Sequence, residues 1–383
     1  MDGHFGTARL GDGLATTFAA AASQHDRERT FPFGNIARLH EARLLGLTVP
    51  RRHGGREGGL RQAAELVREV GRGCASTALV LAMQLMHQKL IASNVRWPET
   101  LAARVAVDAV ERGALVNALR VEPALGTPAR GGMPATIARR TARGWSLSGR
   151  KISATGAPAL SWLLVWARTE DAEPLVGNFL VPAGIDGVSI VETWDQLGLR
   201  ASASHDVVFD NVLLPDDHAV DIRPVGSWRE RDPWQVIWNA VLIGAVYTGV
   251  AEAARDWLVR FLNERVPANL GYPLARLPRM REALGAIEAR LLTNHQLIAA
   301  NAAQTDADTP PSITDSNLIK VVLADGAIAV VERAVQLAGN NALARSNPLE
   351  RHLRDVLCAR VHTPQTDSAY TAAGRAALGV EGD

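Results

Sequence analysis

The sequence has few cysteines and no excess of charge of one sign. Its 383 residues include only Cys74 and Cys358, and 41 Lys and Arg residues face 40 Asp and Glu residues. Two cysteines inside apolar segments exclude a disulfide scaffold and predict buried free thiols in a reducing cytosol. A net charge near zero gives no electrostatic footprint for nucleic acid or for an anionic membrane. We therefore expect neither as a partner.

Targeting and membrane signals are also missing. The start, Met1–Gly6, has no basic region that leads into an apolar core, so we expect no secretory signal. We identify no membrane span, which needs roughly eighteen apolar residues in a row. These absences predict a cytoplasmic protein. With 47% hydrophobic residues, the chain is long enough for two or three domains.

The hydrophobic period changes twice along the chain. Helical spacing runs from Gly13 to about Val110, short β-type segments separated by Gly, Pro and Asp follow from Gly113, and helical spacing returns after Trp228. This order predicts an α+β fold. It has an N-terminal helical domain (1–112), a middle domain of short strands that forms an antiparallel β-barrel or a sandwich (113–223), and a C-terminal bundle of four long helices and a short one (224–383).

Two smaller patterns predict loops. The pair Asp210-Asn211 lies between two β-type segments and predicts a turn. The glycine-rich stretch 50–59 is interpreted as a surface loop and not as a phosphate cradle. No strand leads into that stretch, and no Gly-Lys-Ser/Thr follows it.

Two histidines end apolar helical patterns. A stripe of apolar residues at four-residue intervals, Leu349 to Val361, predicts a late helix that stops just before His362. A helix C-terminus favours the cationic form of an imidazole, although a simple cap is the alternative. His87 ends the almost wholly apolar run that begins at Ala78. It is therefore a pocket candidate.

Four stretches, in this order and spacing, resemble the acyl-CoA dehydrogenase superfamily. They are residues 36–50 with the following His-Gly-Gly, 144–156, 194–215 and 348–355. The resemblance covers nearly the whole chain. It implies the same three domains, with a flavin held between the β domain and the bundle.

The resemblance also implies which residues bind the cofactor. They are Leu119 and Val121 on a strand against the flavin, Thr127 near the phosphates, Ser153 and Thr155 beside the isoalloxazine, Arg265 reaching a neighbouring subunit's pyrophosphate, and Gln336 with Gly339 near the dinucleotide. The family's Gln-x-x-Gly-Gly-x-Gly motif keeps only Gln336 and Gly339. Losing glycines where backbone approaches a diphosphate is compatible with FMN. FAD is the family's default cofactor, and FMN is the alternative.

Two departures from the family bear on the chemistry. The position of the dehydrogenase's catalytic glutamate is Thr363, and the alternative glutamate position is near Trp238. Neither side chain can act as a general base. His362 stands beside Thr363, in a pattern that resembles the flavin-dependent monooxygenase branch, such as dibenzothiophene monooxygenase. That resemblance implies catalytic roles for His362, His87 and Ser153, and no metal ion.

Three functions are open at this point. The first is a monooxygenase-like enzyme in which reduced flavin reacts with oxygen, and His362 with Ser153 or Thr155 stabilises the peroxide or deprotonates a small-molecule substrate. A flavin reductase or an electron-transfer protein would be its partner. The second is thioester oxidation with an unusual base, Asp367 or Glu122. The third is a ligand-binding protein without turnover. In each case we expect a homodimer or homotetramer formed through the C-terminal helices.

Overall fold

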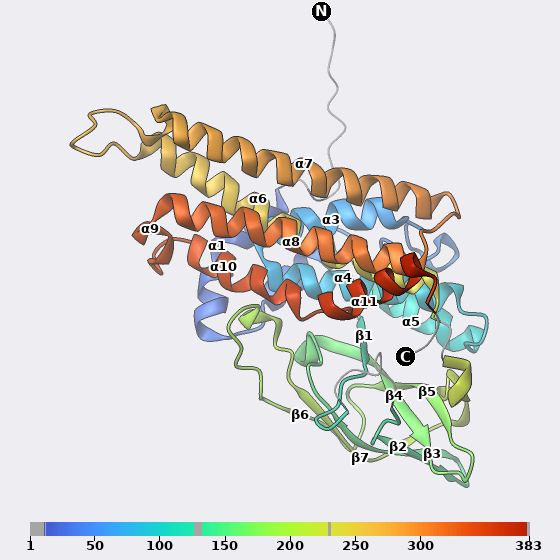
Figure 1. The fold of residues 1–383 in the computed structure, drawn as a ribbon. Helices are drawn as coiled ribbons and strands as arrows, with labels where there is room; N and C mark the ends of the chain where they lie inside the picture. Colours follow the sequence, from blue (N-terminus) through green and yellow to red (C-terminus); the bar gives the residue numbers. More distant parts are fainter. Residues whose placement is uncertain (1–10, 12, 126–131, 229–230, 381–383) are drawn as a thin grey trace, which may run out of the picture.

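The N-terminal part of the chain is helical. The computed structural model describes residues 11, 13–125, 132–228 and 231–380. Its first helices are α1 (Leu14–Glu28), α2 (Phe33–Glu41), α3 (Leu60–Gly73), α4 (Ala75–Ser93) and α5 (Glu99–Glu111). Helix α4 is apolar almost all round because it packs against α3, α6 and strand β1 at once. It therefore connects the helical part to the sheet (Figure 1).

A mixed sheet occupies the middle of the chain. Its strands are β1 (Leu115–Leu119), β2 (Ile137–Thr141), β3 (Gly144–Lys151), β4 (Leu160–Thr169), β5 (Leu175–Pro182), β6 (Val188–Val191), β7 (Asp206–Leu214) and β8 (Asp221–Pro224). The order is β6-β7-β3-β2-β4-β5-β8, and β1 pairs with β4. The α+β class is confirmed. Strands β1 and β2 run parallel to β4, whereas the other pairings are antiparallel as expected.

The predicted turn at Asp210-Asn211 is wrong. Both residues lie inside β7, where Asn211 has a φ of 50°. The register with β3 shifts there, so that Asp210 and Asn211 together face Ser148. This is a β-bulge, in which two residues oppose one. Short polar side chains tolerate the left-handed conformation of a bulge as readily as that of a turn, so composition alone cannot distinguish the two.

Long helices form the C-terminal part. They are α6 (Pro233–Glu264), α7 (Pro278–Asp306) and α8 (Ile313–Ala338), followed by α9 (Asn340–Leu343), α10 (Leu349–Leu357) and α11 (Thr366–Leu378). Helix α6 is long and apolar enough to cross a membrane, a window that the sequence analysis did not identify. However, 83% of that window is buried inside the protein. Helix α6 is the central core helix, since it packs against α3, α4, α7, α8 and α10.

The late helix ends earlier than the apolar stripe predicts. Helix α10 stops at Leu357 and continues only as a 3-10 turn, Cys358–Arg360. Val361, the last member of the predicted stripe, is 71% exposed. The domain boundaries at 112/113 and 223/224 stay predictions. In the structure β1 begins at Leu115 and α6 at Pro233.

Candidate functional site

The backbone that follows β3 alternates in its hydrogen bonds. Every second amide donates to a carbonyl of another segment: Ile152 to Val121, Ala154 to His205 and Gly156 to Ser202. The amides of Ser153 and Thr155 lie between these and donate to no acceptor among the described residues. Ser153 is exposed and has a left-handed φ of 56°. Two free main-chain donors and two small hydroxyls fit the carbonyl and nitrogen edge of a flavin ring.

Thr155 is held from two sides. Its carbonyl accepts a hydrogen bond from Asn117 Nδ2 at 3.0 Å, and its hydroxyl accepts one from Ser204 at 3.1 Å. Because the Thr155 hydroxyl already accepts, its own hydrogen is available to a ligand. Sequence reasoning missed Asn117 and Ser204. Nothing in a strand interior marks Asn117 as different from an ordinary polar residue.

His87 belongs to the same group. It is buried on α4 and hydrogen-bonds the side chain of Asn117. Burial lowers the pKa of His87 to about 4, and the positive charge of Arg120 contributes. The imidazole is therefore neutral at neutral pH. The side-chain amide of Asn117 on β1 thus connects His87 on α4 to Thr155 after β3.

The strand predicted to lie against the flavin leads into a buried ion pair. Leu119 is 1% exposed, and Val121 offers its carbonyl to Ile152. Glu122 accepts a hydrogen bond from Lys151 Nζ at 2.5 Å and another from Thr136 Oγ1 at 2.6 Å. Burial alone would raise the pKa of Glu122, but these hydrogen bonds outweigh it and the pKa is lowered. A carboxylate held in this way is a poor general base.

His362 contacts the interior of α6. Its Nε2 lies 2.7 Å from the hydroxyl of Tyr247. Burial raises the pKa of Tyr247 well above its usual value, so the phenol keeps its proton. Burial, together with the charge of Lys320, lowers the pKa of His362 to about 4. The expectation of a cation stabilised by the helix end is therefore wrong. A full charge on Lys320 and loss of solvent outweigh a helix dipole.

Lys320 organises the loop that carries His362. Its Nζ is buried and donates to the carbonyls of Ala359, His362 and Pro364 at 2.9, 2.6 and 3.1 Å. All three carbonyls lie beyond Leu357, where α10 ends. Burial lowers the pKa of Lys320 to about 8. The loop is thus fixed from α8 by one ammonium group.

The positions of the missing glutamates are close to this loop. The carbonyl of Thr363 accepts a hydrogen bond from Asn239 at 3.0 Å. Trp238, the residue before Asn239, is 1% exposed. Asp367 is exposed at the start of α11. Neither missing-glutamate position therefore offers a carboxylate, and the Asp367 side chain faces solvent.

The remaining predicted cofactor residues lie elsewhere. Arg265 is exposed where α6 ends, and Gly339 ends α8 with a φ of 58°. Gln336 is exposed, and its side-chain oxygen accepts a hydrogen bond from Arg333 at 3.1 Å. The end of the bundle with α9 and the loop after α6 is opposite the end with α11 (Figure 1). Within one chain these residues do not meet Ser153. Thr127 lies outside the described residues.

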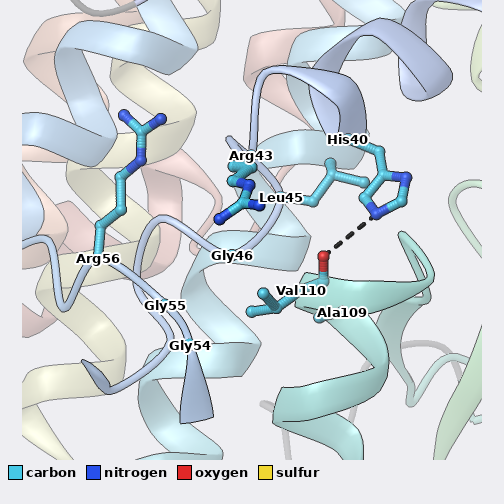
Figure 2. Close-up of a pocket in the computed structure, with 9 residues that line it drawn as sticks. All are labelled: His40, Arg43, Leu45, Gly46, Gly54, Gly55, Arg56, Ala109 and Val110. Carbon is cyan, nitrogen blue, oxygen red and sulfur yellow. Dashed lines mark hydrogen bonds between the residues drawn. The ribbon is translucent and has the colours of Figure 1, made fainter. Parts of the chain in front are cut away.

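A separate cavity of about 250 Å³ lies in the N-terminal helical part. Figure 2 shows His40 and Arg43 at the end of α2 beside the loop with Gly54 and Gly55, and Val110 on α5. None of the predicted site residues lines it. His40 Nε2 lies 3.2 Å from the carbonyl of Val110, and the loop amides bond within their own segment. The loop interpretation of residues 50–59 therefore agrees with its hydrogen bonding.

The described residues include neither a metal-binding cluster nor a reactive thiol. In the described ranges, no group of three or more His, Cys, Asp or Glu side chains could hold a metal ion. Cys74 and Cys358 are both free, the first buried and the second half-buried. Burial raises the pKa of both thiols, in Cys358 to about 12. Neither is a reactive thiolate.

Comparison with known proteins gives matches along most of the chain. Family models for acyl-CoA dehydrogenases match in three parts: the N-terminal domain at residues 11–94, the middle domain at 120–212 and the C-terminal domain at 241–366. The putative acyl-CoA dehydrogenase YdbM of Bacillus subtilis is 34% identical over 93% of this chain and 92% of that protein.

Two further similarities involve flavin enzymes with other substrates. L-evernosamine nitrososynthase of a Micromonospora species is 29% identical over 90% of this chain and 83% of that protein. A solved structure of KijD3 with FMN and a dTDP-linked amino-keto sugar has a TM-score of 0.84 and 28% identity. It covers 97% of this chain and 93% of that chain. This chain therefore belongs to the acyl-CoA dehydrogenase superfamily of flavin-dependent oxidoreductases.

Proposed function

We propose that this protein is a monooxygenase that uses reduced flavin and molecular oxygen to oxygenate a small molecule. The proposal rests on the residues of the loop after α10. Thr363 stands where a dehydrogenase needs a carboxylate base, and the neighbouring ionisable group is a neutral His362 paired with Tyr247. Similarity to a nitrososynthase and to KijD3 at 28–29% identity supports this choice.

The chain's own groups have distinct tasks in this proposal. A bound reduced flavin would supply the electrons that activate oxygen. The free amides of Ser153 and Thr155 would hold the ring edge and leave its face open. His362 can hold or release a proton at Nδ1, because Tyr247 can act as donor or acceptor toward Nε2. His87, held by Asn117, offers a second neutral imidazole.

The cofactor and the partners belong to the same proposal. FAD is the expected flavin and FMN the alternative, since KijD3 was solved with FMN. A separate flavin reductase would supply the reduced cofactor. The protein would act in the cytoplasm on a small-molecule substrate, as a homodimer or homotetramer. In that assembly Arg265 of one copy could reach the flavin of another.

Thioester dehydrogenation is the second candidate. The 34% identity to a putative acyl-CoA dehydrogenase favours it. It would need a base other than the carboxylates considered above. Glu122 is locked in a buried ion pair with Lys151, and Asp367 is exposed. Family membership favours an enzyme over a ligand-binding protein without turnover.

One experiment separates the two candidates. The purified protein would be reconstituted with FAD or FMN and mixed anaerobically with a panel of acyl-CoA thioesters. We expect no bleaching of the flavin absorbance. In parallel, reduced flavin supplied by NADH and a reductase under ¹⁸O₂ should give substrate-dependent incorporation of labelled oxygen into nitrogen-, sulfur- or phenol-containing test compounds. Rapid anaerobic bleaching by a thioester would instead establish the dehydrogenase.

A further inference from the structure

Residues from three strands, together with the residue that follows a fourth, form a row across one face of the sheet. Trp166 on β4 pairs directly with Asn178 on β5, and Asn178 pairs with Asp221 on β8. Arg120 directly follows β1, whose last residue pairs with Val165. Directly paired residues point to the same face of a sheet. The guanidinium carbon of Arg120 lies 4.6 Å from the centroid of the Trp166 ring, so the row begins with a cation on an aromatic platform.

Arg120 forms no hydrogen bond or ion pair with a residue that the structure describes, and its Nε is buried without a partner. The nearby negative group is Asp221, which acts to raise the pKa of Arg120. The carboxylate in the row, Asp221, is already used by Arg223, whose Nε and NH2 donate to it at 2.7 and 2.6 Å. The Oδ1 atom of Asn178 is also buried and unpaired, but it is an acceptor and needs a donor. A buried donor without a partner is costly, so the Nε of Arg120 is best satisfied by an external acceptor.

The row is next to the candidate site. Arg120 lies between Leu119 and Val121, the two strand residues predicted to lie against the flavin. Arg120 is close enough to His87 to add to the effect of burial in lowering the pKa of that imidazole. Burial and Arg231 lower the pKa of Arg120 itself, and Asp221 opposes them. A negative group placed beside Arg120 would be attracted by its guanidinium.

We propose that Arg120 binds an oxyanion of the substrate, a carboxylate or a phosphate, with Trp166 as the platform that holds the guanidinium in place. The planar fork of an arginine matches such groups through two hydrogen bonds, which a lysine cannot reproduce. The substrate is thus an anionic small molecule. That this anion belongs to the substrate rests on the proposed oxygenase function, whereas the binding of an oxyanion does not.

The test measures binding to the flavin-free protein. Sodium phosphate and sodium benzoate would be titrated at constant ionic strength into wild type, Arg120→Gln and Arg120→Lys, with binding followed by calorimetry. We expect saturable binding of one probe to wild type, at least tenfold weaker binding to Arg120→Gln and an intermediate affinity for Arg120→Lys. Which probe binds distinguishes a phosphate from a carboxylate. No saturable binding of either probe to wild type overturns the proposal.

Arg104 on α5 provides a matched control, because it lies against another tryptophan of β4. The guanidinium carbon of Arg104 lies 5.1 Å from the centroid of the Trp162 ring, the same kind of contact, but Arg104 is exposed. Arg104→Gln should bind the probe as wild type does. Equal binding by Arg120→Gln and wild type would refute the proposal. Should Arg120→Gln not fold, Arg120→Lys decides: unchanged affinity refutes the proposal, and a several-fold loss supports it.

The outcome is independent of the oxygenase assay. If oxyanion binding depends on Arg120 but the protein only oxidises thioesters, the Arg120 site stands and the proposed oxygenase function is refuted. If labelled oxygen is incorporated but oxyanion binding does not depend on Arg120, the proposed function stands and the Arg120 site is refuted.

Discussion

The hydroxyl of Tyr247 lies 2.7 Å from Nε2 of His362 and so joins the middle of α6 to the loop after α10. Both groups are neutral at neutral pH, because burial raises the pKa of the phenol and lowers that of the imidazole to about 4. A neutral donor and a neutral acceptor can exchange roles without moving charge. His362 was predicted from the sequence, but no pattern in the sequence indicates its partner Tyr247.

Replacing either member of the pair should slow turnover. We expect His362→Ala to lower the oxygenation rate by roughly two to four orders of magnitude, the range for loss of an acid–base group. Tyr247→Phe should lower the rate less and leave the melting temperature within a few degrees, since the ring stays in place. His362→Ala should also cost about 1–3 kcal/mol of stability, because the buried phenol then lacks its partner.

A double-mutant cycle checks this coupling. Turnover and urea unfolding would be measured for both single variants and for the double variant. If the two effects on stability simply add, the hydrogen bond between Tyr247 and His362 contributes nothing. Full activity in His362→Ala would show that His362 is only a structural residue of this loop.

Acid should destabilise the protein through its buried histidines. The pKa of His362 and of His87 is lowered to about 4, and that of His352 to about 3, from 6.5. As pH falls below 6.5, the histidines of the unfolded chain therefore bind protons, whereas these histidines of the native protein stay neutral. Stability falls by at most about 1.4 kcal/mol per pH unit for each histidine, until the native pKa is reached.

His362→Gln isolates one of these contributions. Urea unfolding of wild type and variant between pH 7 and pH 4.5 should give a shallower decline for the variant. The pKa of Asp355 is raised to about 6 by burial, so its titration opposes the histidines. That contribution cancels in the comparison. Parallel curves for the two proteins would mean that His362 titrates normally in the folded state.

The buried ion pair between Glu122 and Lys151 should matter for stability and not for chemistry. Glu122→Gln leaves the Lys151 ammonium buried without its charge partner, and the loss of one member of such a pair costs about 3–5 kcal/mol. We expect a lower melting temperature but an unchanged turnover per bound flavin at 20 °C. A variant with normal stability and no turnover would make Glu122 a catalytic base after all.

The Arg265→Ala variant tests whether Arg265 contacts a flavin across the subunit interface. If it contacts the flavin of a second copy, Arg265→Ala should weaken flavin binding by about tenfold while the molecular mass by light scattering stays that of a dimer or tetramer. Arg143→Ala, at an exposed position in the turn between β2 and β3, is a suitable control. A wild-type monomer at micromolar concentration would remove both the assembly and the role of Arg265.

The elements were more predictable than the site. Helical spacing was expected to give way to β-type spacing at Gly113, and β1 begins at Leu115, because the hydrophobic period changes abruptly there. The end of α10 was placed too late because the apolar stripe continues to Val361, which is 71% exposed and lies beyond the 3-10 turn. Asn117, Tyr247 and Arg120 were not found. Each lies in an ordinary apolar pattern, and only tertiary packing brings α4 to Asn117, the loop after α10 to Tyr247 and Trp166 to Arg120.

The alternating amides after β3 have a consequence for cofactor choice. Main-chain donors do not depend on the side chains around them, so Ser153 and Thr155 could be replaced by many residues without removing the donors. FAD and FMN share the ring that such donors would meet. In the proposed binding mode the turn would therefore recognise what the two flavins have in common. Selection between them must be made where the molecules differ, at the phosphate end, beyond the reach of this part of the sheet.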